Sequence, residues 1–182
     1  MTGRGPLSHV RVLDLTDLRG ALCGRILADL GADVVKVEWS NGDITNRFGP
    51  AKGGITGVFL HMNAGKRGIS VDRTAPGGTE LLLRLAERAD VFVQNLKPGS
   101  LAKLGFAAKR LRRDHPRLVT CAISGYGESG PYAQRKAYDM LIQAEAGVAS
   151  VTGGPESSAA RVGVSVCDIA AGMNSYEAIL EA

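Results

Sequence analysis

The chain has 182 residues, of which 45% are hydrophobic and 22% are charged, with a formal net charge of +4. This composition is typical of a soluble globular protein, and no apolar run approaches the ~18 residues that a membrane-spanning helix needs. The basic residues are spread along the chain instead of forming one stripe with interleaved aromatic residues, which disfavours a nucleic-acid-binding domain. A local anionic ligand explains the charge better.

The cysteines Cys23, Cys121 and Cys167 are far apart and form no C-x-x-C pair. They lie in apolar helix or strand patterns, which argues against a disulfide framework and against a zinc site. The chain also lacks an H-E-x-x-H helix, so we expect no metal cofactor. Its first residues show no hydrophobic export signal, and we therefore expect a cytoplasmic protein.

Apolar runs of strand length alternate along the chain with amphipathic segments of helix length. The runs span residues 10–16, 32–38, 67–72, 89–95 and 117–124. Helical patterns span residues 19–31, 79–89, 101–106, 107–114, 140–147 and 167–182. This alternation predicts βαβ units and therefore an α/β fold, with an open, mostly parallel, Rossmann-like sheet flanked by helices. The last helical pattern stops without a cap or a breaker, so we interpret the chain as one that ends early.

The loops after the predicted strands are the places to search for a site, because ligands bind at the carboxyl ends of strands in open α/β sheets. Residues 94–99 start a helix whose amides suit an anion, and the glycines of residues 124–132 let backbone approach a ligand closely. Residues 61–67 form a basic turn that either binds a phosphate or only lies at an edge of the sheet. The spacing of its residues favours the sheet edge. P-loop and G-x-G-x-x-G spacings are missing, which disfavours nucleoside-triphosphatases and standard dinucleotide sites, and a serine-hydrolase elbow is missing too.

Asp168 is the one carboxylate within residues 160–173, where its neighbours are small and apolar. An ionised side chain in such surroundings is costly unless it is paired or used. On local evidence alone, the favoured role for Asp168 is the N-cap of the helix at 167–182. Asp139 likewise precedes a helical pattern, where an acid favours the positive end of the helix dipole.

Several segments, taken together, carry a resemblance to a known family. They are VRVLDLT, ILADLGADVVKVE followed by GD, NAGKRGISVD, ADVFVQNLKPGSLAKLGF, PRLVTCAISGYGESGPYAQRKAYD, QAEAGVASVTG and RVGVSVCDIAAGM. In this order they resemble the class III coenzyme A (CoA) transferases, a family that includes formyl-CoA transferase, carnitine CoA-transferase and the α-methylacyl-CoA racemases. The resemblance implies that residues 1–182 form the N-terminal part of the family's large domain, with the second, smaller domain absent. It also implies an interlocked homodimer in full-length relatives.

The resemblance implies a catalytic role for Asp168, which matches the family's nucleophilic aspartate. Its carboxylate would attack an acyl-CoA thioester to give a mixed anhydride, which the released thiolate would convert to an aspartyl-CoA thioester. Such covalent catalysis divides one difficult acyl exchange into easier steps.

The same resemblance implies a set of CoA contacts. Lys136 matches a family lysine, and Lys103 replaces an arginine, which keeps the charge but loses the bidentate fork. Trp39 stands where an arginine lies beside adenine, and its ring would stack on the base instead. The further matching positions are Leu18, Arg19, Val71 and Asn95. The chain reads GAL where many relatives read AGP, and QNLKPG where they read ENFRPG, so details of the CoA pocket differ.

Position 138 separates the two enzyme classes within the family. Racemases resemble the chain overall but have a histidine there as half of an acid/base pair, whereas this chain has Tyr138. A tyrosine, with an unperturbed pKa of about 10, is a poor general base at neutral pH, so a transferase is favoured, and Asp139 then has a structural or supportive role. The resemblance is strongest to the branch that uses succinyl-CoA as donor and malate, citramalate, itaconate or mesaconate as acceptor. A racemase-like enzyme and a truncated, non-catalytic CoA-binding remnant are the alternatives.

Overall fold

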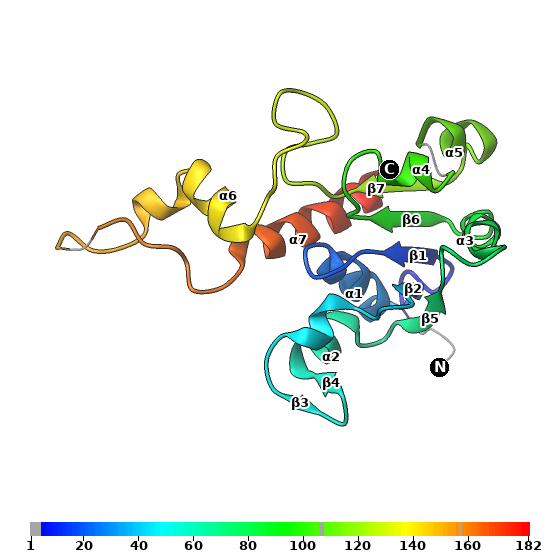
Figure 1. The fold of residues 1–182 in the computed structure, drawn as a ribbon, viewed down its shortest axis with the longest axis horizontal. Coiled ribbons are helices and arrows are strands. Elements are labelled where there is room, and N and C mark those ends of the chain that lie inside the picture. The colour runs from blue at the N-terminus through cyan, green and yellow to red at the C-terminus, as the bar shows by residue number, and fades with distance from the viewer. Residues whose placement is uncertain (1–4, 106–107, 157) are drawn as a thin grey trace.

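The computed structural model describes residues 5–105, 108–156 and 158–182. Its centre is a five-stranded parallel sheet with the order β5-β2-β1-β6-β7 (Figure 1). The strands are β1 (Arg11–Leu15), β2 (Asp33–Trp39), β5 (Arg67–Val71), β6 (Val91–Gln94) and β7 (Val119–Ala122). Each overlaps one of the apolar runs, so the predicted α/β fold with a parallel, Rossmann-like sheet is confirmed.

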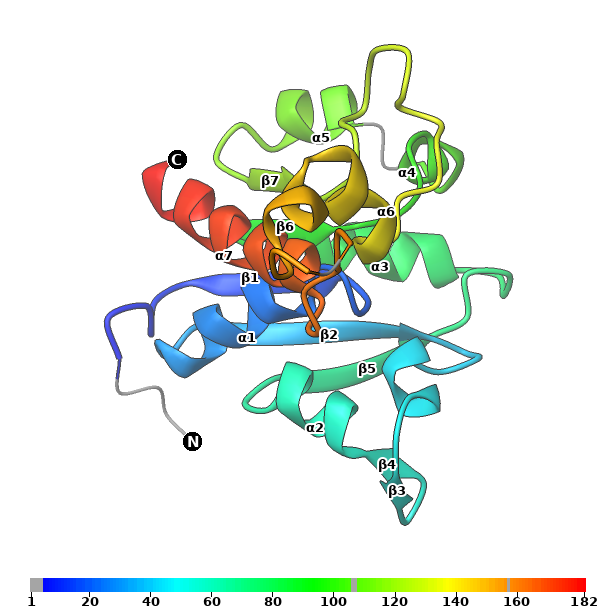
Figure 2. The same cartoon turned by 90° about the vertical axis from the view of Figure 1, so that its left-hand side faces the viewer.

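Helices cover both faces of this sheet, as Figure 2 shows. One layer holds α1 (Ala21–Asp29) and α7 (Val166–Glu181), and the other holds α3 (Gly78–Ala86), α4 (Ser100–Lys103) and α5 (Ala108–Asp114). The alternation of side chains along β1 builds both cores: Val12 packs in the core of α1 and α7, whereas Leu13 and Leu15 pack in the core of α3 and α5. Strands buried on both faces produce the continuous apolar runs seen in the sequence. Phe106 and Ala107, at the junction of two predicted helices, lie outside the described residues.

Two further parts of the chain stand outside these layers. Between β2 and β5 lie η1 (Ile44–Arg47), the antiparallel hairpin of β3 (Ala51–Lys52) and β4 (Ile55–Thr56), and α2 (Gly57–Asn63). Between β7 and α7, the chain forms α6 (Asp139–Glu145) and η2 (Val148–Val151), which extend away from the sheet (Figure 1). In the described part of the chain, no helix is both long and apolar enough to cross a membrane.

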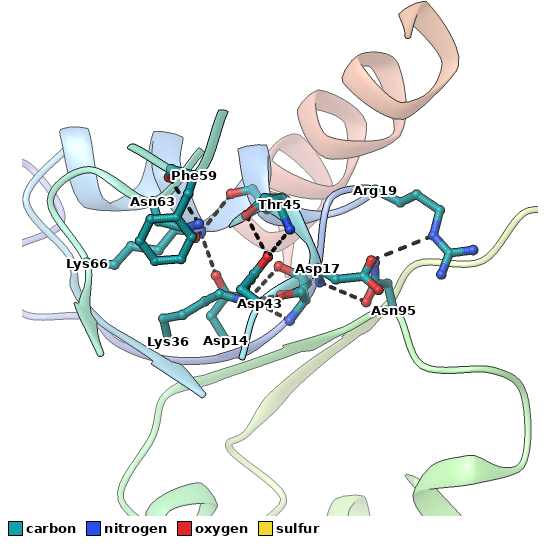
Figure 3. A network of polar contacts seen from close by, with 12 residues as sticks. Asp14, Asp17, Arg19, Lys36, Asp43, Thr45, Phe59, Asn63, Lys66 and Asn95 are labelled. Atoms are coloured by element: carbon teal, nitrogen blue, oxygen red, sulfur yellow. Dashed lines mark hydrogen bonds and ion pairs between the residues drawn. The ribbon is translucent and has the colours of Figure 1, made fainter. Parts of the chain in front are cut away.

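Two buried ion pairs lie beside the carboxyl half of β1 (Figure 3). Lys66 Nζ is 2.8 Å from Asp14 Oδ2, and Lys36 Nζ is 2.7 Å from Asp43 Oδ2, with all four side chains at most 4% exposed. A glycine in α1 makes room for the first pair, because a Cβ on Gly24 would lie 2.3 Å from Asp14 Oδ2. Residues 61–67, predicted as a basic turn, instead form the end of α2, a short turn and the first residue of the edge strand β5, and Lys66 points inward to a carboxylate.

Burial and pairing shift the pKa values of these groups in opposite ways. Burial lowers the pKa of Lys66 below its usual value, although Asp14 favours the charged form. Burial alone would raise the pKa of Asp43, but hydrogen bonds from Lys36 and Thr45 hold it below its usual value. The region between β2 and β5 is thus tied to the sheet by charged groups that water does not reach.

Candidate functional site

A cavity of about 370 Å³ opens at the carboxyl ends of β1, β6 and β7. Its walls come from Arg19 after β1, the segments 95–98 after β6 and 123–126 after β7, the segment 133–138 before α6, and the first turns of α6 and α7. The order of the strands reverses between β1 and β6, and open α/β sheets bind ligands at this switch point. The fold thus places the cavity where a ligand is expected.

Asp168 lies in the first turn of α7 and lines this cavity. The N-cap of α7 is Ser165, not Asp168, so the role favoured by local evidence is wrong. Asp139, the first residue of α6, binds the free amide at the start of α7 instead: its Oδ1 accepts a hydrogen bond from the Cys167 amide at 2.8 Å. Its Oδ2 accepts a hydrogen bond from Gln143 Nε2 at 2.6 Å. Because Asp139 satisfies the end of the helix, the carboxylate of Asp168 is left for another purpose.

The surroundings of Asp168 make its negative charge costly. Burial raises the pKa of Asp168 above its usual value, the nearby Asp139 carboxylate raises it further, and Arg19 opposes the rise. Among the described residues, no side chain or amide donates a hydrogen bond to the Asp168 carboxylate. A half-buried carboxylate of this kind is a stronger nucleophile than a fully hydrated one, because fewer hydrogen bonds must break before it attacks.

A close contact between two helices sets the position of Asp168. Gly172 follows it by one turn and is buried against α1, where a Cβ would lie 2.9 Å from Leu22 Cβ and 3.3 Å from the Cys23 amide nitrogen. With glycine at this position, α7 packs directly on α1. The first turn of α7 thereby faces the cavity.

Three of the expected CoA contacts lie with Asp168 around the cavity: Arg19, Asn95 and Lys136. Asn95 joins the loops after β6 and β1, since its Nδ2 donates to Asp17 Oδ1 at 2.5 Å and its Oδ1 accepts from the Asp17 amide at 3.1 Å (Figure 3). Asp17 also lies 3.6 Å from Arg19 Nε. The sequence pattern does not single out Asp17, because its partner Asn95 is 78 residues away.

The other four predicted contacts lie outside the cavity wall. Trp39 and Val71 are register partners at the ends of β2 and β5; Val71 is buried, and the Arg73 guanidinium lies 5.3 Å from the centre of the Trp39 ring. Leu18 is half-buried in the turn after β1, and Lys103 is exposed at the end of α4. Their assignment to CoA stays a prediction.

The structure adds two cations that the sequence reasoning did not select, Lys97 and Arg135, both in the cavity wall. The Arg135 guanidinium lies 4.0 Å from the Tyr132 ring centre and pairs with Glu145 at 3.3 Å. The signal for Arg135 was its position next to Lys136. With Arg19 and Lys136, these cations give the cavity a positive rim that suits anionic ligands.

The cysteine side chains are poorly suited to act as nucleophiles. All three cysteines are free thiols, and burial raises the pKa of Cys23 to about 12. Burial likewise raises the pKa of Cys167, the immediate neighbour of Asp168, which disfavours a thiolate nucleophile. Within residues 5–105, 108–156 and 158–182, no group of three His, Cys, Asp or Glu side chains is arranged to hold a metal ion.

A parallel sheet covered by helices on both faces, with an acid-bearing cavity at its switch point, defines a doubly wound α/β protein. Residues 7–182 match the model of CoA-transferase family III, and the chain belongs to this family. The family expected from the sequence motifs is thus confirmed.

Individual relatives agree with this assignment. The chain is 42% identical over 183 residues to the succinate–glutarate CoA-transferase of Agrobacterium fabrum, covering 96% of this chain and 46% of that protein. It is 38% identical to the human succinyl-CoA:glutarate CoA-transferase, over 96% of this chain and 41% of that protein. A crystal structure of a CaiB/BaiF family protein from Brucella suis superposes with a TM-score of 0.92 at 39% identity, covering 97% of this chain and 48% of that one. The chain spans about half the length of the curated relatives it matches.

Proposed function

We propose that the protein transfers CoA between an acyl-CoA and a carboxylic acid, through a thioester on Asp168. The observation that carries this proposal is the half-buried Asp168 carboxylate, which lines the switch-point cavity and receives no hydrogen bond from the described residues. Membership in CoA-transferase family III supplies the reaction class.

The reaction proceeds by acyl and thiol exchange at one carboxylate. An Asp168 oxygen attacks the thioester carbonyl, the carbon–sulfur bond breaks, and CoA thiolate leaves a mixed anhydride behind. The thiolate then attacks the side-chain carbonyl carbon of Asp168, which releases the first acid as its carboxylate and leaves an aspartyl-CoA thioester. An incoming carboxylate repeats these steps in reverse and departs as the new acyl-CoA. Each step exchanges one acyl bond for another, so no proton and no outside reagent is consumed.

The cations around the cavity support the binding of CoA and of the acid. Lys136 is exposed on the rim and suits a phosphate group of CoA, and Lys103 extends the positive charge along the surface beyond β6. Trp39, Leu18 and Val71 complete the proposed CoA contacts at the carboxyl edge of the sheet.

For the acids, we propose succinyl-CoA as donor and a small dicarboxylic acid as acceptor. The relatives from Agrobacterium fabrum and from human are both named for succinyl or succinate and glutarate, which are dicarboxylic acids. Malate, citramalate, itaconate and mesaconate, expected from the sequence, belong to the same chemical class and are to be tested beside glutarate.

The direct test is the intact mass of the purified protein after incubation with succinyl-CoA. The wild type should gain the mass of CoA less one water, and peptide mapping should place the gain on Asp168. Asp168→Asn should show no gain, whereas Asp114→Asn, which removes an exposed carboxylate on α5, should behave like the wild type. Absence of the adduct from the wild type, or its persistence in Asp168→Asn, would refute the covalent mechanism.

A homodimer and a cytoplasmic location remain parts of the proposal. Large apolar side chains are exposed along the segment from α6 to α7, where a partner would cover them; examples are Tyr138, Met140, Val151 and Val164. Light scattering of the purified protein tests the dimer, and a strictly monomeric mass at micromolar concentration would overturn it.

A further inference from the structure

Arg19 presents an unused hydrogen-bonding edge at the cavity. Its Nε lies 3.6 Å from Asp17 Oδ1, and its two terminal nitrogens donate no hydrogen bond to any of the described residues. Figure 3 shows that the contact from Arg19 to Asp17 ends on Nε. A guanidinium held through Nε keeps a pair of parallel N–H donors for a second carboxylate.

The carboxylate that holds Arg19 is itself anchored. Asp17 and Asn95 exchange two hydrogen bonds across the ends of β1 and β6. The preceding carbonyl, of Thr16, accepts a hydrogen bond from the buried ammonium of Lys36. Because the turn after β1 is tied to the sheet on both sides, the backbone that carries Arg19 is held in place before any ligand arrives.

The other cavity cations are less suited to a carboxylate. Arg135 is already engaged by Glu145 and by the face of Tyr132. Lys97 and Lys136 are flexible point charges without the planar fork that matches the two oxygens of a carboxylate. Arg19 is also close enough to Asp168 for its charge to lower the pKa of that carboxyl. It therefore lies near the place where the acyl group reacts.

We infer that Arg19 binds the second carboxylate of a dicarboxylic substrate while the first reacts at Asp168, which makes Arg19 a specificity-determining residue. This inference rests on the proposed function, because the reacting carboxyl is the one transferred to and from Asp168. It assigns the guanidinium to the acid, while the backbone of the same turn remains beside CoA. Asp17 is then a positioning residue, which acts only by holding Arg19.

The test compares two donors that differ in one charged group. Succinyl-CoA and butyryl-CoA have acyl chains of equal length, and only the succinyl group ends in a carboxylate. Wild-type protein should form the Asp168 thioester faster from succinyl-CoA, and Arg19→Met should reduce this preference by about tenfold or more, the size expected for a charge-assisted pair. Arg19→Lys should restore part of it. Arg88→Met, which removes an exposed arginine at the amino edge of the sheet, should keep the wild-type preference.

A binding measurement separates failure of this inference from failure of the proposed function. Calorimetric titration of Asp168→Asn with glutarate and with valerate needs no covalent step, and Arg19→Met should weaken glutarate binding about tenfold in that background while leaving valerate unchanged. Normal thioester formation with an unchanged succinyl preference in Arg19→Met would overturn the inference and leave the proposed function standing. If no thioester forms but glutarate binding still depends on Arg19, the proposed function is overturned and the role of Arg19 in binding the acid stands. Equal losses for both donors and both acids would also overturn the inference.

Discussion

Removing the buried ammonium of Lys66 should destabilise the fold strongly. The Lys66 Nζ donates to Asp14 Oδ2, to the Ala21 carbonyl and to Asn63 Oδ1, at 2.8, 2.8 and 3.0 Å. Lys66→Met leaves all three acceptors without this donor and leaves a fully buried carboxylate without its counter-ion. Breaking a buried pair in this way costs about 3–5 kcal/mol. The lower end is expected here, because Asp14 keeps two hydrogen bonds from Thr16.

The neighbouring residue supplies a matched control. Arg67 pairs with Asp33 at 2.7 Å, but the two side chains are 68% and 47% exposed. Exposed pairs contribute at most about 1 kcal/mol, so Arg67→Met should be nearly neutral. Urea unfolding, followed by circular dichroism, should therefore separate the two variants by at least about 2 kcal/mol in the free energy of unfolding at equal slope.

A double variant isolates the uncompensated charge. Asp14→Asn combined with Lys66→Met should be more stable than Lys66→Met alone, because the buried carboxylate is then neutral. If Lys66→Met unfolds within about 1 kcal/mol of Arg67→Met, the reasoning about burial is wrong, whatever the double variant does.

Three further outcomes follow from the site. Asp168→Asn should be more stable than wild type at pH 7, because a pKa above the ordinary value of 3.8 in the folded state means that ionised Asp168 opposes folding. In thermal melts, this stability advantage should shrink as the pH falls toward 3.8, because wild-type Asp168 then becomes protonated. An advantage that does not change with pH would contradict the argument. Asp139→Asn removes the like charge that raises the pKa of Asp168, so the rate of thioester formation should reach its plateau at a lower pH. The weaker hydrogen bond at the start of α7 should also lower the free energy of unfolding by about 1 kcal/mol. A plateau that moves to higher pH would contradict the argument. Gly172→Ala should separate α7 from α1 and cost about 1–3 kcal/mol by urea unfolding, and a crystal structure with α7 unmoved would count against the close-contact argument.

The sheet was predictable because its strands are short apolar runs between helical patterns. The strand at 10–16 appears as Arg11–Leu15, although it contains Asp14, which local pattern alone places at the surface. Asp14 and Lys36 are register partners on neighbouring strands, yet each pairs with another residue. These pairings depend on the path of the chain from β2 to β5, which no local pattern reveals.

That path was also the part of the fold that the sequence analysis missed. Each strand of the hairpin at 51–56 has two residues, too short for a side-chain period to be recognised. The glycines at 53 and 54 form the turn with positive φ and resemble an ordinary loop in the sequence.

Site residues that belong to a family motif could be predicted from the sequence, whereas contacts between distant segments could not. The family motif singled out Asp168, which the structure places on the cavity wall, whereas the local pattern wrongly made it the N-cap of α7. Asp139, which accepts the Cys167 amide at the start of α7, lies 28 residues before Cys167, and the Asp17–Asn95 pair spans 78 residues. Contacts of this range appear only once the strands are in place.

The packing of α7 on α1 also has a consequence for biogenesis. All five strands of the sheet and α1 are synthesised before α7, which must then return across the sheet to the earliest helix. Until it docks, the face of the sheet beneath α7 is uncovered and Asp168 is not at the cavity. Asp168 therefore reaches the cavity only after the sheet and α1 have formed, so the proposed thioester chemistry requires the docked α7.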